Sequence, residues 1–287
     1  MSAYLVTGAS GFVGRALVDE LGRRGAGVIR LSTADGDIVD PATLRPHRTA
    51  PIDRVFHLAA RTFVPQSWCD PADFHRVNTG GTLNVLEFCR ERRIPLTYVS
   101  AYVYGQPIEQ PIKEDHPLVP NNPYALSKVL AERACEFYAR VYSLPVTVVR
   151  PFNIYGAGQD AHFLIPTIVH QVLWEDEISV QDLVPRRDYI YISDLLELLE
   201  ATRLAPPGYS VYNAGTGVSL SVAEVIAAAQ AEAGTLKQVR SGQTQRAQEI
   251  GDTRAGIEKA RIELGWIPKH SFRDGIRVVI GAMKETK

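Results

Sequence analysis

Three side chains in this sequence have the types and spacing to move a proton. Tyr124 and Lys128 stand four residues apart, and Ser100 lies upstream of both. Residues at positions i and i+4 share one face of a helix, so the Lys128 ammonium is expected beside the Tyr124 phenol. Lowering a tyrosine pKa of about 10 by about three units needs roughly 4 kcal/mol. One cation about 5 Å away supplies roughly 3 kcal/mol at an effective dielectric near 20, and a positively charged nicotinamide would add the rest. The set therefore suggests hydride-transfer chemistry.

The alternative is an ordinary pair on a solvated helix, because Tyr-x-x-x-Lys is common by chance. The local sequence favours the chemical interpretation. Asn121 or Asn122 can cap the helix, with Pro123 in its first turn. Tyr124 would then lie at the helix N-terminus, where the positive end of the dipole also favours a phenolate.

A glycine-rich loop near the start of the chain predicts a dinucleotide site. An apolar run ends at Thr7, the glycines Gly8, Gly11 and Gly14 follow at intervals of three, and an amphipathic segment continues to Leu21. This order describes a strand, a tight loop and a helix. Glycines let the backbone turn sharply and approach a pyrophosphate at the helix N-terminus.

Strand and helix patterns alternate along the first half of the chain, as an α/β protein with a Rossmann-type, doubly wound parallel sheet requires. The predicted strands are 4–7, 27–31, 54–58, 96–99 and 146–150. The predicted helices between them are 14–23, 79–92 and 124–142.

The pattern becomes irregular after Arg150, which predicts a smaller C-terminal substrate-binding lobe. Short helices are expected at 162–173, 222–233 and 256–264, while 187–204 is expected to return to the main sheet. The predicted division is a dinucleotide-binding domain at 1–153, rejoined by 187–213, and a substrate-binding lobe at 154–186 and 214–287.

Composition agrees with a compact cytoplasmic enzyme. The 287 residues are 45% hydrophobic and carry a net charge of -1, which gives no footprint for nucleic acid or an anionic membrane. We expect no membrane-spanning segment and no signal peptide. Cys69, Cys89 and Cys135 are widely spaced and are expected to be reduced core thiols. The seven histidines lack metal spacing, so no metal site is predicted; His57 and the others are expected to be structural or surface residues.

The chain also resembles a known family over nearly its whole length, namely the extended short-chain dehydrogenase/reductases that modify nucleotide sugars, often called the epimerase/dehydratase family. The resemblance rests on many motifs in one order. They are Thr7-Gly8-x-x-Gly11-x-x-Gly14, Gly36-Asp37-Ile38, His57-Leu58-Ala59-Ala60, Asn78-x-x-Gly81-Thr82, Ser100-Ala101-Tyr102-Val103-Tyr104-Gly105, Tyr124-x-x-x-Lys128, Arg150-Pro151-Phe152-Asn153-Ile154-Tyr155-Gly156, Arg187-Asp188-Tyr189-Ile190-Tyr191-Ile192 and Leu264-Gly265-Trp266-x-Pro268.

The resemblance implies NAD or NADP as cofactor, a nucleotide-diphosphate sugar as substrate and a homodimer. The residues it assigns to the cofactor, besides Tyr124 and Lys128, are Gly8, Gly11, Phe12, Val13, Gly14, Asp37, Ile38, Ala59, Ala60, Asn78, Pro151 and Phe152. Singly, each could equally be a core or turn residue.

The residues assigned to the substrate are fewer. Arg187 and Arg246 match positions that clamp the diphosphate, and Asn153 matches a polar residue near it. A guanidinium suits phosphate geometry, although surface arginine is the common alternative. Thr62, Val64 and Ser100 complete the set, whereas the neighbouring Arg186 is expected at the rim.

Two departures from the family pattern bear on the net reaction. Family members that eliminate water carry an acidic residue directly after the serine or threonine, and here Ala101-Tyr102 follows Ser100. With no acid to protonate a departing hydroxyl, a 4,6-dehydratase is disfavoured.

The second departure is the segment after the second strand, which is too short for the usual helix and third strand. Ser32 stands where NAD-preferring members place a carboxylate. The sequence therefore predicts no repulsion of NADP, and Arg15 or Arg30 could meet a 2′-phosphate. This contraction resembles the reductases of 4-keto-6-deoxy nucleotide sugars.

The predicted activity is hydride transfer at sugar C4, with Tyr124 as proton donor, Ser100 holding the oxygen and Lys128 orienting the cofactor. Reduction of a 4-keto-6-deoxy nucleotide sugar is the expected net reaction. A 4-epimerase of the UDP-glucose type is the alternative, and a non-catalytic dinucleotide-binding regulator is a remote one.

Overall fold

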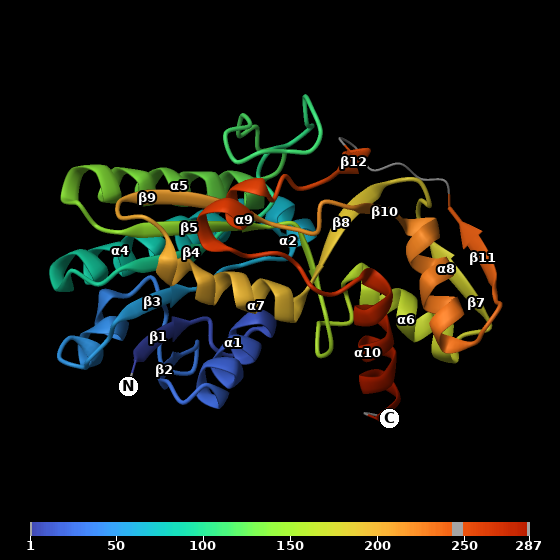
Figure 1. Cartoon of the computed structure of the whole chain (residues 1–287), viewed down its shortest axis with the longest axis horizontal. Helices are drawn as coiled ribbons and strands as arrows, with labels where there is room; N and C mark the ends of the chain where they lie inside the picture. The colour runs from blue at the N-terminus through green and yellow to red at the C-terminus, as the bar shows by residue number, and fades with distance from the viewer. Residues whose placement is uncertain (1, 243–248, 286–287) are drawn as a thin grey trace.

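The computed structural model describes residues 2–242 and 249–285. At the centre of the described part lies a parallel sheet, drawn in Figure 1, which has six strands. The strand order is β2-β1-β3-β4-β5-β9. The strand bounds are β1 Ala3–Thr7, β2 Gly27–Leu31, β3 Arg54–His57, β4 Leu96–Val99, β5 Val146–Pro151 and β9 Tyr209–Ala214. The predicted parallel sheet is confirmed, and the five predicted strands agree with the observed ones to within one residue at each end.

The strand order reverses at β1, which pairs with β2 on one side and β3 on the other. Loops leaving β1 and β3 therefore diverge and open a crevice at the carboxyl ends of these strands, where doubly wound proteins bind ligands. Between β2 and β3 the chain forms only a 3₁₀ helix, η1 (Pro41–His47). The predicted contraction of this segment is thus confirmed.

Helices cover both faces of the sheet. On one face lie α1 (Phe12–Arg23) and α7 (Ile192–Ala201), and on the other lie α4 (Gly81–Arg92) and α5 (Pro123–Tyr142), as Figure 1 shows. Alternate residues of each strand supply the two cores, because successive side chains of a strand point to opposite faces. On β1, Tyr4 and Val6 join the α1 and α7 side, and Leu5 joins the α4 and α5 side.

The cysteines fit the prediction only in part. All three are free thiols. Cys89 of α4 and Cys135 of α5 are buried in the core, but the expectation that Cys69 is buried is wrong. Cys69 ends the short helix α2 (Val64–Cys69), which lies at the surface.

The smaller lobe is built on two small sheets and three helices. One sheet has the order β10-β8-β12, with β6 also on β8, and the other pairs β11 with β7. The bounds are β6 Asn153–Tyr155, β7 Glu177–Val180, β8 Arg186–Tyr191, β10 Ser219–Ser221, β11 Gln238–Ser241, β12 Asp252–Thr253, α6 Leu164–Trp174, α8 Val222–Ala233 and α10 Phe272–Glu285. The remaining elements are α3 Pro71–Phe74, the π-helix η2 His75–Gly80, η3 Thr202–Leu204 and α9 Glu258–Leu264.

The prediction for 187–204 is corrected by this topology. Strand β8 pairs within the lobe, because the edge of the main sheet beside β5 is filled by β9, from Val146 opposite Tyr209 to Pro151 opposite Ala214. Of the residues from 187 to 214, the part that returns to the main sheet is α7 with the following β9. The residue limits given above for the two domains stay a prediction.

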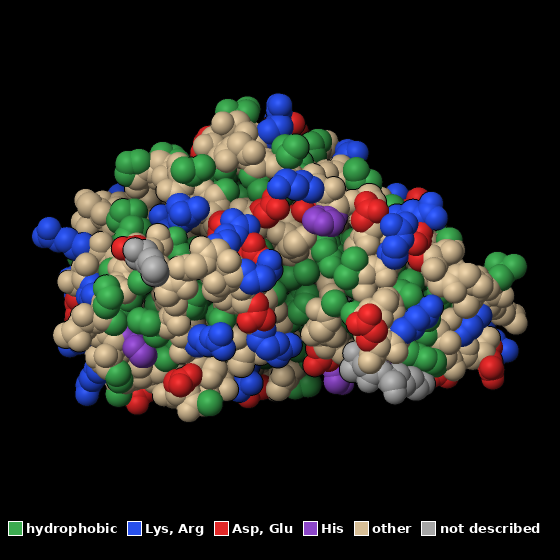
Figure 2. Space-filling model, turned by 60° about the horizontal axis from the view of Figure 1, so that its bottom comes forward, with side chains coloured by type: hydrophobic (Ala, Val, Ile, Leu, Met, Phe, Trp, Pro, Cys, Tyr) green, Lys and Arg blue, Asp and Glu red, His purple; other side chains and the backbone are tan. Residues whose placement is uncertain are grey.

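The surface in Figure 2 mixes basic, acidic and apolar side chains over one face of the molecule. This mixture matches the near-neutral net charge of -1. Within the described ranges, the chain has no helix that combines the length and the apolar character needed to cross a membrane.

Candidate active site at the strand ends

The glycine loop after β1 is shaped for close approach of a ligand. Gly8 has φ +68°, and a Cβ there would lie 2.7 Å from the Ala59 nitrogen. A Cβ on Gly14 would lie 2.0 Å from the Gly8 carbonyl oxygen. Gly11 stands at the N-cap of α1 and offers no side-chain cap, so the first amides of this helix are left for an anion. Any side chain at Gly8 or Gly14 would force this cradle apart.

Ser100 directly follows β4, and its backbone nitrogen donates to the Val149 carbonyl at 2.8 Å. Its side chain is 4% exposed, yet the Ser100 hydroxyl makes no hydrogen bond with any described group. A buried hydroxyl left without a partner costs free energy, roughly 1–3 kcal/mol. This cost is removed if a ligand oxygen completes the bond.

Helix α5 presents Tyr124 in its first turn, as predicted. The cap is Asn122, whose side chain accepts a hydrogen bond from the Ala125 nitrogen at 2.8 Å, and Pro123 is the first helical residue. The Tyr124 ring is half-buried and meets the Phe74 ring edge-on at 6.3 Å.

The predicted electrostatic link from Lys128 to Tyr124 is not the arrangement found. Burial raises the pKa of Tyr124 above its ordinary value. The Lys128 ammonium instead donates to the Val99 carbonyl at 2.7 Å and lies 4.5 Å from the centre of the Tyr98 ring. In the protein alone, Tyr124 is therefore held as the neutral phenol.

Lys128 itself is strongly perturbed. It is 2% exposed, and burial lowers its pKa to about 7, against a smaller opposing effect of Glu132. The Glu132 carboxylate is committed to Arg150, 2.6 Å away, in a buried ion pair. Near neutral pH, Lys128 is thus poised between its charged and neutral forms.

His57 is a structural residue, in line with the prediction. One ring nitrogen lies 2.7 Å from the Thr7 hydroxyl and the other 3.0 Å from the Thr82 hydroxyl. Burial, and next the charge of Lys128, lower the pKa of His57 to about 3. Its ring is neutral at physiological pH and ties β1 and β3 to α4.

Asn78 joins the cofactor crevice to the catalytic helix. Its side-chain oxygen accepts from the Arg61 nitrogen at 2.7 Å, and its amide nitrogen donates to the Ser127 hydroxyl at 2.8 Å. Ala59 and Ala60 follow β3 directly and are half-buried. Asn78 therefore positions the start of α5 beside the end of β3.

Asp37 is exposed and already accepts two hydrogen bonds. One oxygen accepts from the Arg76 guanidinium at 2.7 Å and the other from the Val39 nitrogen at 3.1 Å. The Arg76 bond lowers the pKa of Asp37. Ile38, beside it, is buried.

The end of β5 reaches the same edge of the sheet. Pro151 ends β5, and Phe152 is buried with its nitrogen bonded to the Ala214 carbonyl at 2.8 Å. Because Val99 pairs with Val149, the residues after β4 and those that end β5 lie side by side. The structure thus gathers Ser100, the start of α5 and the end of β5.

The predicted substrate residues approach from the lobe. Arg187 lies on β8, where its guanidinium pairs with Glu249 and donates to the Ile250 carbonyl at 2.7 Å. Asn153, on the adjoining β6, donates to the Asp188 carbonyl at 3.3 Å. Burial raises the pKa of Tyr102, and the charge of Arg187 opposes that rise, which places this charge near the residues after β4.

Three predicted substrate residues lie elsewhere in the chain. Thr62 and Val64 are exposed, just before and at the start of α2. Arg246 lies outside the described residues. Sequence patterns did not identify Glu249, which pairs with Arg187, or Tyr98, whose ring lies beside Lys128. Neither carries a motif of its own, and each is recognised only from the side chain that it meets.

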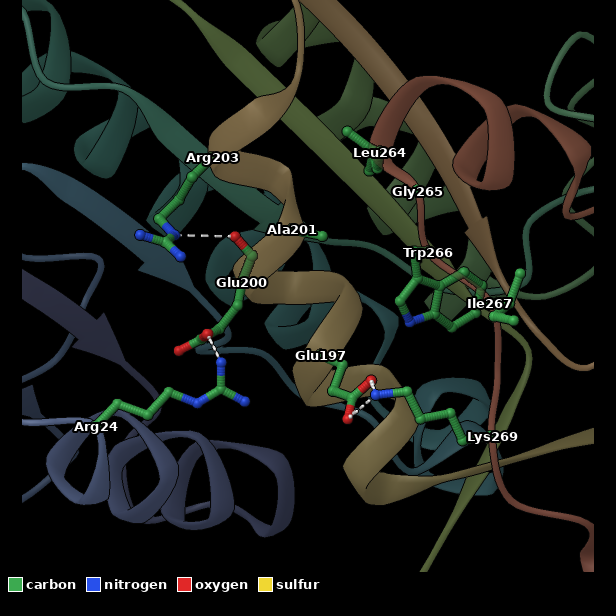
Figure 3. Close-up of a pocket in the computed structure, with 10 residues that line it drawn as sticks. All are labelled: Arg24, Glu197, Glu200, Ala201, Arg203, Leu264, Gly265, Trp266, Ile267 and Lys269. Carbon is green, nitrogen blue, oxygen red and sulfur yellow. Dashed lines mark hydrogen bonds and ion pairs between the residues drawn. The ribbon is translucent and has the colours of Figure 1, made fainter.

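A separate hollow of about 340 Å³ lies between α1, α7 and the segment after α9 (Figure 3). Arg24 pairs there with Glu200 and Lys269 with Glu197, and Arg203 donates to the Glu200 carbonyl at 3.1 Å. None of the predicted site residues lines it. The candidate active site is therefore the crevice at the strand ends and not this hollow.

The parallel sheet, the glycine loop and the Ser-Tyr-Lys set together define a short-chain dehydrogenase/reductase. The sequence model described as the NAD dependent epimerase/dehydratase family matches residues 4–215. The chain belongs to this family. The relatives described next are enzymes of nucleotide-sugar metabolism.

Similar proteins include both kinds of enzyme foreseen from the sequence. The chain is 32% identical to UDP-glucose 4-epimerase of Azospirillum brasilense, over 95% of this chain and 89% of that protein. It is 31% identical to GDP-6-deoxy-D-mannose reductase of Pseudomonas aeruginosa, over 96% of this chain and 95% of that protein.

Solved structures agree. RMD from Pseudomonas aeruginosa, complexed with NADPH, superposes with a TM-score of 0.92 at 29% identity and covers 100% of both chains. UDP-glucose 4-epimerase from Thermotoga maritima, with UDP-glucose, has a TM-score of 0.91 at 27% identity and covers 99% of both. The predicted family and fold are confirmed.

Proposed function

We propose that this enzyme reduces the C4 carbonyl of a 4-keto-6-deoxy nucleotide sugar, with NAD(P)H as the reductant. The observations that carry the proposal are the buried, unpartnered Ser100 hydroxyl and the neutral Tyr124 at the start of α5, which packs against Ala101, the residue after Ser100. A reductase needs a proton donor at this place, and burial keeps Tyr124 protonated. Similarity to a GDP-6-deoxy-D-mannose reductase supports the same reaction.

The glycine loop fits a dinucleotide, since the cradle that Gly8 and Gly14 leave open would be filled by any Cβ. Its pyrophosphate would lie against Gly11, Phe12 and Val13 at the start of α1. The remaining contacts would come from Asp37, Ile38, Ala59, Ala60, Asn78, Pro151 and Phe152. When bound, NAD or NADP supplies the site with a hydride donor or acceptor.

The residues of the chain supply the proton and the oxygen contacts. Tyr124 gives its phenolic proton to the alkoxide that develops at C4, and the Ser100 hydroxyl donates a hydrogen bond to the same oxygen. Lys128, fixed to Val99 at the end of β4, orients the nicotinamide ribose.

The nucleotide diphosphate would be held from the lobe. Arg187 is the principal cation for it, with Asn153 on the adjacent strand β6. Thr62 and Val64 would border the sugar from the opposite side of the crevice, and Arg246 would add a second guanidinium. Two guanidinium forks match the about two negative charges of a diphosphate.

A 4-epimerase is the second candidate, favoured by the 32% identity to a UDP-glucose 4-epimerase. An epimerase takes hydride and returns it to the other face of the sugar, so it gains from never releasing its cofactor. A reductase must exchange its cofactor in every cycle. The segment between β2 and β3 is shortened to η1. A shorter segment would offer fewer hydrogen bonds to the cofactor, each worth roughly 1 kcal/mol, which favours exchange.

Cofactor content separates the two reactions. We expect protein purified without added cofactor to be largely empty, and NADH or NADPH to be oxidised in step with a 4-keto-6-deoxy nucleotide sugar. Stoichiometric NAD released on denaturation, together with epimerisation of a 4-hydroxy nucleotide sugar without added cofactor, would establish the epimerase instead.

We also propose a homodimer through α4 and α5. Leu126, Leu130, Phe137 and Val141 are exposed apolar residues of α5 at spacings that place them along one side of the helix. Leu83 of the neighbouring α4 is exposed as well. A second copy would cover this apolar face. A cytoplasmic location remains a prediction, in keeping with the three free thiols.

A further inference from the structure

Ser32, the residue directly after β2, has no charge, but the loop that follows it carries the carboxylate of Asp35. Leu31 ends β2 beside the glycine loop, since its carbonyl accepts a hydrogen bond from the Ala9 nitrogen at 3.1 Å. Ser32 comes next and has no charge. In dinucleotide-binding folds, an acidic residue about 20 positions after the glycine loop contacts the hydroxyls of the adenosine ribose. Here Ser32 occupies this strand end, and the nearest acid along the chain is Asp35.

The Asp35 carboxylate folds back onto Ser32. One of its oxygens, Oδ2, accepts from the Ser32 nitrogen and from the Ser32 hydroxyl, both at 2.8 Å. The Asp35 nitrogen in turn donates to the Ser32 carbonyl at 3.1 Å. This arrangement, the Ser32–Asp35 latch, brings a negative charge to the end of β2 and leaves the other carboxylate oxygen, Oδ1, free of these bonds.

The rest of the loop holds the latch in place. Gly36 has φ +142°, and a Cβ there would lie 2.5 Å from the Thr43 hydroxyl, so only glycine lets the chain turn directly after Asp35. The Thr43 hydroxyl donates to the Asp37 carbonyl at 2.7 Å. Because these bonds fix both ends of the turn, the Asp35 carboxylate stays at the strand end.

Other charged groups near the loop do not occupy this position. The Asp37 carboxylate is committed to Arg76 and the Val39 nitrogen. The Arg15 guanidinium donates to the Ser10 carbonyl at 2.7 Å, over the glycine loop. Arg30 is exposed on β2 and remains the one cation of this strand that could attract a phosphate.

We propose that Asp35, fixed by Ser32, contacts the adenosine ribose and repels a 2′-phosphate, so that this enzyme uses NAD in preference to NADP. The inference rests on the proposed function, because it assumes the dinucleotide site. It reverses the sequence-based expectation that NADP is not repelled. That expectation considered only the strand-end residue, whereas the latch is visible only once the loop is folded.

Binding of two adenosine fragments tests the proposal without turnover. In calorimetry at low salt, we expect ADP-ribose to bind the wild-type protein at least about tenfold more tightly than its 2′-phosphorylated form. Asp35→Asn keeps an oxygen that can accept both Ser32 bonds but removes the charge. In Asp35→Asn, the preference for ADP-ribose over its 2′-phosphorylated form should fall to about threefold or less, chiefly because the phosphorylated fragment binds more tightly.

Two controls sharpen the result. Asp176→Asn makes the same change of charge at an exposed position in the lobe and should leave the preference unchanged. Ser32→Ala keeps the charge but loosens the latch, so its preference should lie between those of the wild type and Asp35→Asn. Raising the salt to about 0.5 M should also narrow the wild-type preference, because exposed charges are then screened.

The proposal is overturned if the wild-type protein binds the 2′-phosphorylated fragment as tightly as ADP-ribose. If Arg30→Ala then removes that binding, Arg30 and not Asp35 determines the cofactor preference. Such a result would leave the dinucleotide site intact. Failure of both fragments to bind would instead contradict the dinucleotide site itself, and the latch proposal would fall with it.

Discussion

Lys128 and Val99 are joined by a hydrogen bond of 2.7 Å from the ammonium to the backbone carbonyl, which fixes the catalytic helix to the end of β4. Ser100 is the next residue along the chain, so this one contact sets the spacing between the Ser100 hydroxyl and the first turn of α5. Lys128 therefore has a positioning role in addition to its charge. To fill this role, the Lys128 amine must be buried, which disfavours its charged form.

The proton donor is tested by Tyr124→Phe. Loss of the hydroxyl removes only the transferable proton, so turnover should fall by about a hundredfold to ten-thousandfold while the dissociation constants for dinucleotide and nucleotide change little. Steady-state kinetics and calorimetry on the same preparation measure the two effects. Tyr142→Phe, at the exposed end of α5, is the matched control. Turnover within about threefold of the wild type would remove Tyr124 from the mechanism.

Because the Lys128 amine is buried, we expect its replacement to have opposite effects on stability and on activity. Lys128→Met should abolish most activity yet stabilise the fold at neutral and acidic pH, because it removes a desolvated charge. The lost bond to the Val99 carbonyl offsets roughly 1 kcal/mol of that gain.

The sign of the pH dependence follows from the pKa of Lys128, about 7 in the folded protein against the ordinary 10.5. Below pH 7 both states are protonated and the burial penalty is present in full. Between pH 7 and 10.5 the unfolded chain binds more protons than the folded one, so the wild-type protein gains stability as the pH rises. The advantage of Lys128→Met should therefore shrink over this range.

Chemical denaturation at pH 6, 8 and 10 measures this difference. The matched control is Lys113→Met, which changes an exposed lysine and should show no such trend. A stability difference between Lys128→Met and the wild type that stays constant with pH would contradict the prediction.

Much of the fold could be predicted from the sequence because the central strands are buried on both faces. Runs such as 96–99 and 146–149 are apolar, aromatic or β-branched throughout, as parallel strands between helix layers require. Strand β8 shows the limit of this reasoning. The sequence pattern predicts that 187–204 returns to the main sheet, whereas β8 (Arg186–Tyr191) pairs with β10 and β6 in the lobe. These pairings follow from the tertiary arrangement.

The candidate site was predictable in its motif residues and not in their partners. The i, i+4 spacing placed Tyr124 and Lys128 on one helix correctly. It could not indicate that Lys128 would bond to a backbone carbonyl, because every residue has one. The pairing of Arg187 with Glu249 likewise joins residues that are distant in sequence and carry no shared pattern.

The apolar side of α5 predicts the oligomeric state. Phe137→Asp should convert a dimer to a monomer, because a charge in the middle of a covered apolar face is costly to bury. Sedimentation velocity measures the mass, and Ile262→Asp, an exposed residue of α9, is the control. A monomeric wild-type protein, or a Phe137→Asp variant that stays dimeric, would exclude this surface as the interface.

The contact between Arg187 and Glu249 predicts opposite effects of two substitutions on nucleotide binding. A diphosphate must compete with the Glu249 carboxylate for the guanidinium. Arg187→Ala should weaken binding of a nucleoside diphosphate by about tenfold or more, since a charge-assisted hydrogen bond contributes roughly 1.5–3 kcal/mol. Glu249→Gln should strengthen it, because the competing charge is gone while the side chain keeps its size.

Calorimetry with UDP, GDP and dTDP measures both effects and also identifies the preferred base. Arg186→Ala is the matched control, because this arginine pairs with Glu224 and Ser219 within the lobe, and its loss should leave diphosphate affinity nearly unchanged. Dinucleotide affinity should stay constant in all three variants. Unchanged diphosphate affinity in Arg187→Ala would refute the clamp, and a loss of dinucleotide affinity instead would place Arg187 in the other half of the crevice.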